Sequence, residues 1–186
     1  VLEMGTAPPG RGRVVFATGE REGRRSRAFC APVRIPEEVF LVLRPHGGQA
    51  DWTTFLHELG HALHFAYTSP DRPFELRWLG DNSVTEGYAM LFDHRTQDRL
   101  WLARYTSLGK RELAPFLRAS GFEELHFIRR YCGKLLYERE LYGTSGSWDA
   151  LPDAYVQRLR DATGFRYDPA DAFVDVDQRF YAARYL

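Results

Sequence analysis

The sequence predicts a mainly helical α+β fold, in which a small antiparallel β-sheet near the N-terminus precedes a group of helices. Three short β-type runs lie before residue 44, and turn-forming glycines and prolines separate them. From residue 51 onward, the apolar residues recur at the spacing of amphipathic helices. A third observation, a histidine-rich helix at residues 55–64, marks where the chemistry of the chain is concentrated.

The β-type runs cover residues 13–18, 26–30 and 38–43, and the short connections between them predict an antiparallel meander. A first helix is expected to begin at Asp51, whose carboxylate is a favoured N-cap group, and to end near Thr68. Further helices are expected at residues 82–108, 111–119, 122–141 and 149–163, with a last one beginning near Val174.

The composition is that of an ordinary folded protein. Apolar residues make up 44% and aromatic residues 15% of the 186 residues, which is too apolar for a disordered chain. The 25 basic and 25 acidic residues give a net charge of zero, so the chain lacks the basic excess of a nucleic-acid-binding protein. No apolar run reaches the roughly 18–20 residues that a membrane span needs, so we expect no membrane partner.

The cysteines indicate a cellular compartment, and the two ends of the chain indicate whether it is part of a longer domain. Cys30 and Cys132 do not form a CxxC pair, and free thiols in a reducing compartment are the simpler interpretation, which predicts a cytoplasmic protein. The chain begins at Val1 without an initiator methionine and ends at Leu186 within FYAARYL, a helix-like stretch. We therefore expect a fragment of a longer domain.

Residues 55–64 read FLHELGHALH, so a glutamate and three histidines interrupt a stretch that is otherwise apolar or small. On an α-helix, His57 and His61 lie one turn apart, about 6 Å along the axis, where both imidazoles can bind one tetrahedral zinc ion. Glu58 points about 100° away from His57 and can take a proton from a water molecule that the ion activates. This is the arrangement of HExxH hydrolases, and residue frequencies predict on the order of one chance match in a few hundred chains of this length.

A catalytic zinc site needs a third protein ligand beside the two histidines. An HExxHxxGxxH pattern is excluded, because positions 64 and 67 are His64 and Tyr67. His64 lies too far along the axis to reach the same ion, so we expect it to pack or to form a hydrogen bond near the site. Glu86 is the preferred ligand, since a second helix holds geometry better than a loop and Gly87 beside it can allow close approach. The other downstream acids are Asp71, Glu75, Asp81 and Asp93.

Zinc-bound imidazoles usually donate their second ring N–H to a partner. Asp51 and Asp93 are both candidates for this partner, and the sequence does not choose between them. The motif does not determine which metal ion binds, since Co²⁺ and Mn²⁺ accept the same donor atoms. The remaining histidines, expected at the surface or in satisfied core positions, are His46, His94 and His126.

Several stretches resemble the thimet oligopeptidase and oligoendopeptidase F family of zinc peptidases. The most specific is HELGHALH, followed by a glutamate 25 residues after the second histidine within TEGYA, which is Glu86. RSRAFCAP resembles a strand that precedes the metal helix of that family, and VFLVLRP resembles the strand that follows RSRAFCAP. DVDQRFYAARYL resembles the late tyrosine-bearing segment of the family. The resemblance covers most of residues 13–186.

The resemblance implies a zincin-like metallopeptidase core with one zinc ion per chain. The implied ligands are His57, His61 and Glu86, and the implied general base is Glu58. By position, Tyr181 and Tyr185 would contact the substrate and the oxyanion of the reaction. The implied substrates are short unstructured peptides, lying along the strand that contains residues 26–30, where an exposed edge could pair with them.

The chain also departs from the family pattern. Ser26 and Arg27 stand where glycine is usual, and the late segment lacks the histidine and the extra glycines of some members. The chain is also far shorter than the family members. We expect residues 1–186 to be a single catalytic region, with the meander over 13–43 and the helices over 51–186.

Two other functions are compatible with the motif. A fragment that keeps the zinc fold but lacks the rest of its cleft would be a non-catalytic binding or structural module. A membrane-type HELGH peptidase is disfavoured by the lack of apolar spans and by the interval between the motif and Glu86. The sequence predicts neither the oligomeric state nor the cleavage preference.

Overall fold

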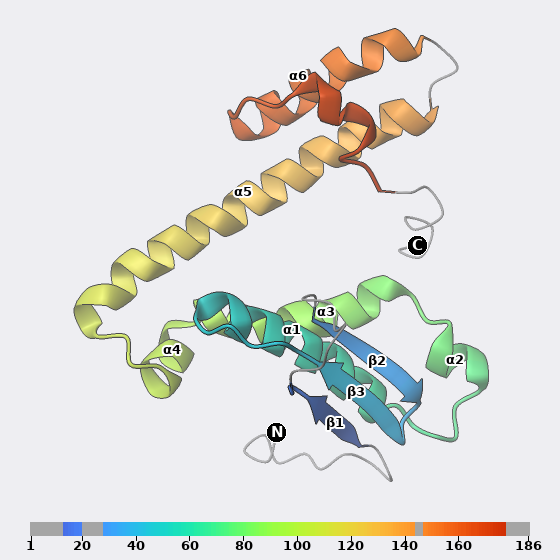
Figure 1. Cartoon of the computed structure of the whole chain (residues 1–186), viewed down its shortest axis with the longest axis vertical. Helices are drawn as coiled ribbons and strands as arrows, with labels where there is room; N and C mark the ends of the chain where they lie inside the picture. The colour runs from blue at the N-terminus through green and yellow to red at the C-terminus, as the bar shows by residue number, and fades with distance from the viewer. Residues whose placement is uncertain (1–12, 20–27, 144–146, 178–186) are drawn as a thin grey trace. The chain divides into compact units, whose positions relative to one another are not determined.

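The computed structural model describes residues 13–19, 28–143 and 147–177, and Figure 1 shows the order of their helices and strands. The chain divides into two compact units, residues 1–107 and residues 108–186. Each unit has a buried apolar cluster of its own. Over their described residues, the first unit holds a three-stranded sheet and four α-helices, whereas the second is helical.

The sheet is mixed, so the predicted antiparallel meander is wrong in its topology. Strands β1 (Val14–Ala17), β2 (Phe29–Arg34) and β3 (Glu38–Val42) lie in the order β1-β3-β2. β2 and β3 are antiparallel, but β1 runs parallel to β3. The tight connection at residues 35–37 forces β2 and β3 into a hairpin, whereas the longer connection after β1 imposes no pairing with β2.

The second strand continues through a proline that the sequence reading placed between strands. Pro32 lies inside β2, and a register shift follows it before Arg34 pairs with Glu38. Proline is tolerated there because β2 is an edge strand of the described sheet, where one side of the backbone has no ladder partner. On the central strand, Val39 and Leu41 are fully buried and pack in one cluster with alanines of the first helix.

Helix α1 (Gln49–Ala66) carries the histidine motif and begins two residues earlier than predicted. Its N-cap is Gly48, with φ of 92°, and not Asp51. Asp51 lies in the first turn, where its carboxylate accepts hydrogen bonds from the backbone N–H of Gly47, at 2.6 Å, and of His46. The acid therefore still stabilises this helix end, but by binding the preceding loop.

The single helix predicted at residues 82–108 is three elements. They are helix α3 (Asn82–Asp93), the 3₁₀ helix η2 (His94–Gln97) and helix α4 (Arg99–Tyr105). The short helix α2 (Phe74–Trp78) lies before them. The break is caused by Asp98, whose extended backbone and carboxylate cap α4 through a 2.8 Å bond from the N–H of Trp101. Asp81 caps α3 in the same way, accepting from the N–H of Ser83 at 2.8 Å.

In the second unit, the two helices predicted at residues 111–119 and 122–141 form one continuous helix, α5 (Lys110–Gly143). A glycine such as Gly121 costs a helix only about 1 kcal/mol, which is too little to end it. Helix α5 is followed by η3 (Trp148–Ala150), α6 (Leu151–Thr163) and η4 (Pro169–Phe173).

The helix predicted to begin near Val174 is not present in residues 174–177, and the rest of that stretch lies outside the described residues. Among the helices that the structure describes, none has both the length and the apolar character needed to cross a membrane.

Candidate metal centre

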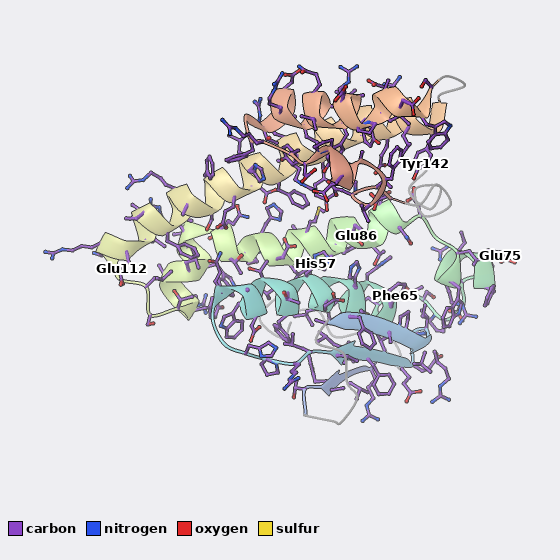
Figure 2. The ribbon with its side chains drawn as sticks, turned by 45° about the horizontal axis from the view of Figure 1, so that its top comes forward. His57, Phe65, Glu75, Glu86, Glu112 and Tyr142 are labelled. Carbon is purple, nitrogen blue, oxygen red and sulfur yellow. The ribbon has the colours of Figure 1, made fainter. Side chains whose placement is uncertain are left out.

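The structure brings the three predicted metal ligands together. His57 and His61 lie one turn apart on α1, and Glu86 lies on α3, which packs against α1. The Oε2 atom of Glu86 is 3.4 Å from Nε2 of His57 and 3.7 Å from Nε2 of His61. Figure 2 shows His57 and Glu86 on these two neighbouring helices.

The spacing of the three donor atoms fits a zinc ion. In a tetrahedral site with bonds of about 2.0–2.1 Å, two ligand atoms are about 3.4 Å apart. The two carboxylate–imidazole distances are 3.4 and 3.7 Å, and one ligand atom of each residue lies within 4.8 Å of the others. Two imidazoles and one carboxylate are also the donor set of catalytic zinc sites, which leave a fourth position for a reactant.

Each imidazole has a hydrogen-bond partner on its second ring nitrogen. Nδ1 of His57 lies 2.9 Å from Oδ2 of Asp93, and Nδ1 of His61 lies 2.8 Å from Oγ1 of Thr85. Both partners come from α3, so the same helix supplies the carboxylate ligand and orients both rings. Of the two acids left open by the sequence, Asp93 takes this position, because Asp51 binds the loop before α1.

The two imidazoles differ in their electrostatics. The hydrogen bond to Asp93 raises the pKa of His57 above its usual value, although burial opposes the shift. Burial, together with the nearby His57, lowers the pKa of His61 to about 4. At neutral pH, His61 is therefore neutral and ready to donate its lone pair, whereas His57 holds a proton more tightly.

Sequence reasoning missed two residues of this network. Thr85 directly precedes Glu86, but a threonine in a helix carries no signal of a histidine partner. His94 was expected at the surface, and it is exposed there, yet its Nδ1 lies 2.7 Å from Oδ1 of Asp93. The two oxygens of Asp93 thus contact two different imidazoles.

Glu58, the predicted base, lies half-buried on α1 beside His57. Burial, together with the negative charge of Glu58, raises the pKa of the Cys30 thiol to about 12. The charge of Glu58 also contributes to the raised pKa of His57. Glu58 therefore lies within electrostatic range of both β2 and the ligand group.

Comparison with protein-family models, with curated proteins and with solved structures finds no match.

The other predicted residues lie away from the ligand group or outside the described residues. His64 packs as expected, with its ring stacked 4.8 Å from that of Tyr88, and its buried Nδ1 has no hydrogen-bond partner. Glu75 lies in α2 and Asp71 lies in the loop before it, and both residues are exposed. Tyr181 and Tyr185, the predicted oxyanion partners, lie outside the described residues.

Proposed function

We propose that this protein is a zinc-dependent peptidase with a zincin-like core, which hydrolyses peptide bonds of short unstructured oligopeptides. One observation carries the proposal: His57, His61 and Glu86 converge at the spacing of zinc ligands, on the helix pair that also holds Glu58. A structural role alone would not require two imidazoles and a half-buried carboxylate to face one another across a helix pair.

The residues of the site have separate roles in this proposal. A bound zinc ion supplies Lewis acidity, which polarises the peptide carbonyl and makes water reactive near neutral pH. Glu58 accepts the proton of the attacking water and returns it to the amine that leaves. Asp93 and Thr85 hold the two imidazoles in the orientation that directs Nε2 toward Glu86.

The substrate class comes from the family resemblance, and the edge strand is compatible with it. β2 lies at one edge of the described sheet, and Cys30 within it is close enough for the charge of Glu58 to raise the pKa of its thiol. An extended peptide that pairs with this edge would run past the base, as short unstructured peptides can. From the resemblance alone, we add Tyr181 and Tyr185 as oxyanion partners, and the cytoplasm as the compartment.

The decisive experiment is Glu58→Gln, assayed with a quenched fluorescent peptide library and by metal analysis of the purified protein. We expect zinc content to stay equal to wild type, while kcat/KM falls at least about 100-fold, because the amide cannot accept the proton. Glu75→Gln is the matched control, since Glu75 lies on α2, away from His57 and Glu86 in Figure 2. Turnover by Glu58→Gln at the wild-type rate contradicts the mechanism.

Metal analysis also separates this proposal from the non-catalytic alternative. Wild-type protein that retains zinc but cleaves no member of the library would be a zinc-binding module and not a peptidase. Glu86→Ala is the control for the site itself, because it removes the third ligand and is expected to abolish stoichiometric zinc. Growth with Co²⁺ or Mn²⁺ in place of Zn²⁺ tests the metal identity.

A further inference from the structure

The two helices that carry the candidate ligands are joined by a series of paired side chains. Near the start of α1, Thr53 Oγ1 lies 3.2 Å from Oγ1 of Thr96, which belongs to η2 directly after α3. The His57–Asp93 bond of 2.9 Å and the His61–Thr85 bond of 2.8 Å follow along the same helix. Because residue numbers rise on one side while they fall on the other, α1 and α3 run antiparallel at this interface.

Between these pairs, the backbones of the two helices come into direct contact at Gly60. A Cβ atom at Gly60 would lie 2.5 Å from Cα of Ala89, 2.5 Å from the carbonyl oxygen of Tyr88 and 2.8 Å from the amide nitrogen of Ala89. Gly60 is buried and Ala89 has no exposed surface, so no neighbouring space can take up an added methyl group. All three opposing atoms belong to the backbone, and no side-chain rotation can move them away.

The contact is placed where the spacing of the helices determines the ligand geometry. Gly60 directly precedes His61, and Ala89 lies one turn after Glu86. Carbon atoms in ordinary contact are about 3.5–4.0 Å apart, so an added methyl group would push the helices apart by about 1 Å. The distance from Oε2 of Glu86 to Nε2 of His61 is already 3.7 Å, slightly above the tetrahedral value.

We infer that Gly60 is a positioning residue for the metal centre, an inference that rests on the zinc site of the proposed function. Its contact with the backbone of Ala89 sets the separation of α1 and α3, and through it the reach of Glu86 to the two imidazoles. The glycine beside Glu86 does not have this role, contrary to expectation, because a Cβ at Gly87 meets no atom of the described residues within 4 Å.

The test compares Gly60→Ala with Gly87→Ala in the full chain. Both substitutions add one methyl group within a helix of the same pair, but only one of them meets the opposing backbone. Zinc affinity is measured by competition with a chromophoric chelator, and the coordination geometry by the visible absorption of the Co²⁺-loaded protein. We expect Gly87→Ala to match wild type in both measurements, and Gly60→Ala to lose at least about tenfold in affinity, with a changed cobalt spectrum.

A merely structural glycine would lower the thermal stability of the metal-free protein without altering the cobalt spectrum. Gly60→Ala that folds and binds zinc as wild type does therefore overturns the inference. If Gly60→Ala does not fold, Thr53→Val provides the test, because it loosens the hydroxyl pair without adding atoms. Zinc affinity within about threefold of wild type supports Gly60 as the spacer, whereas a tenfold loss assigns the spacing to the hydroxyl pair and overturns the inference.

The outcomes also separate this inference from the peptidase proposal. Zinc binding that depends on Gly60, in a protein without turnover, supports the spacing role and rejects the peptidase. Turnover that is lost in Glu58→Gln but unchanged in Gly60→Ala, with equal zinc affinity, supports the peptidase and rejects the spacing role. A wild-type protein that binds no zinc rejects both.

Discussion

Replacing Asp93 with asparagine should weaken zinc binding without removing a ligand. Oδ2 of Asp93 accepts a hydrogen bond from Nδ1 of His57 at 2.9 Å, and only 15% of the Asp93 side chain is exposed, so solvent screens the carboxylate weakly. The amide keeps the size of the side chain but loses its charge, and its NH₂ group can present a donor to a ring N–H.

The expected loss is about 10–100-fold in affinity, which is about 1.4–2.8 kcal/mol. We place Asp93→Asn at the upper end, because a charge-assisted hydrogen bond is roughly twice as strong as a neutral one. Thr85→Val removes the neutral partner of His61, whose Nδ1 lies 2.8 Å from the hydroxyl, and should cost only several-fold. The order of the two losses is therefore part of the prediction.

The assay is a chelator competition titration of zinc at pH 7.5, combined with thermal unfolding of the metal-free proteins. Asp98→Asn is the control, because it makes the same chemical change at the N-cap of α4, where asparagine caps as well as aspartate. Its zinc affinity should stay within about twofold of wild type. Zinc binding by Asp93→Asn as tight as wild type, in a folded protein, would refute the orienting role of this carboxylate.

Two further predictions follow from the shifted pKa values. Because burial lowers the pKa of His61 to about 4, the unfolded state binds a proton between pH 6.5 and 4 that the folded state does not, so His61 should contribute a loss on the order of 1–2 kcal/mol to the stability of the metal-free protein between pH 7 and pH 5. Urea unfolding with chelator present measures this, and His61→Asn should show a smaller loss. Because burial raises the pKa of Cys30 to about 12, iodoacetamide at pH 8 should alkylate the exposed Cys132 at least about tenfold faster, as mass spectrometry can follow; equal rates would contradict the burial of that thiol.

The pairing of His57 and His61 could be predicted from the sequence because it depends on local geometry. The four-residue spacing of His57 and His61 places both rings on one face of any α-helix. Glu86 required a further step, the choice of an acid on a second helix, and the structure brings its carboxylate to the two rings. The choice between Asp51 and Asp93 could not be made, since it depends on how α3 is aligned against α1.

The glycine that permits the close approach of α1 and α3 could not be predicted from the sequence either. Gly87 was the natural candidate because it lies next to the ligand, but in the structure Gly60 meets the opposing backbone. A glycine that permits contact between helices looks, in sequence, like any other glycine in a helix. Only the packed pair distinguishes them, since the contact joins residues that are nearly thirty positions apart in the chain.

The sheet and the long helices were mispredicted for opposite reasons. The β2–β3 hairpin is local and was expected, whereas the parallel pairing of β1 with β3 is non-local and has no signal in the turn residues. In the helices, a single helix was expected at residues 82–108, but Asp98 caps α4 and divides that stretch. Two helices were expected at residues 111–119 and 122–141, but α5 continues through Gly121 between them.

The electrostatics around His57 give a physical reason to prefer a cation site over a structural pair of histidines. The bond to Asp93 raises the pKa of His57 most, and the charges of Glu86 and Glu58 add to the shift. Three carboxylates around two half-buried imidazoles repel one another, and water screens them only in part. That repulsion costs the protein free energy when no positive charge is present, and it favours protonation of His57 at the expense of ligation. A divalent cation among the three donor atoms would reverse this cost, because it attracts every one of these carboxylates and replaces the proton on His57.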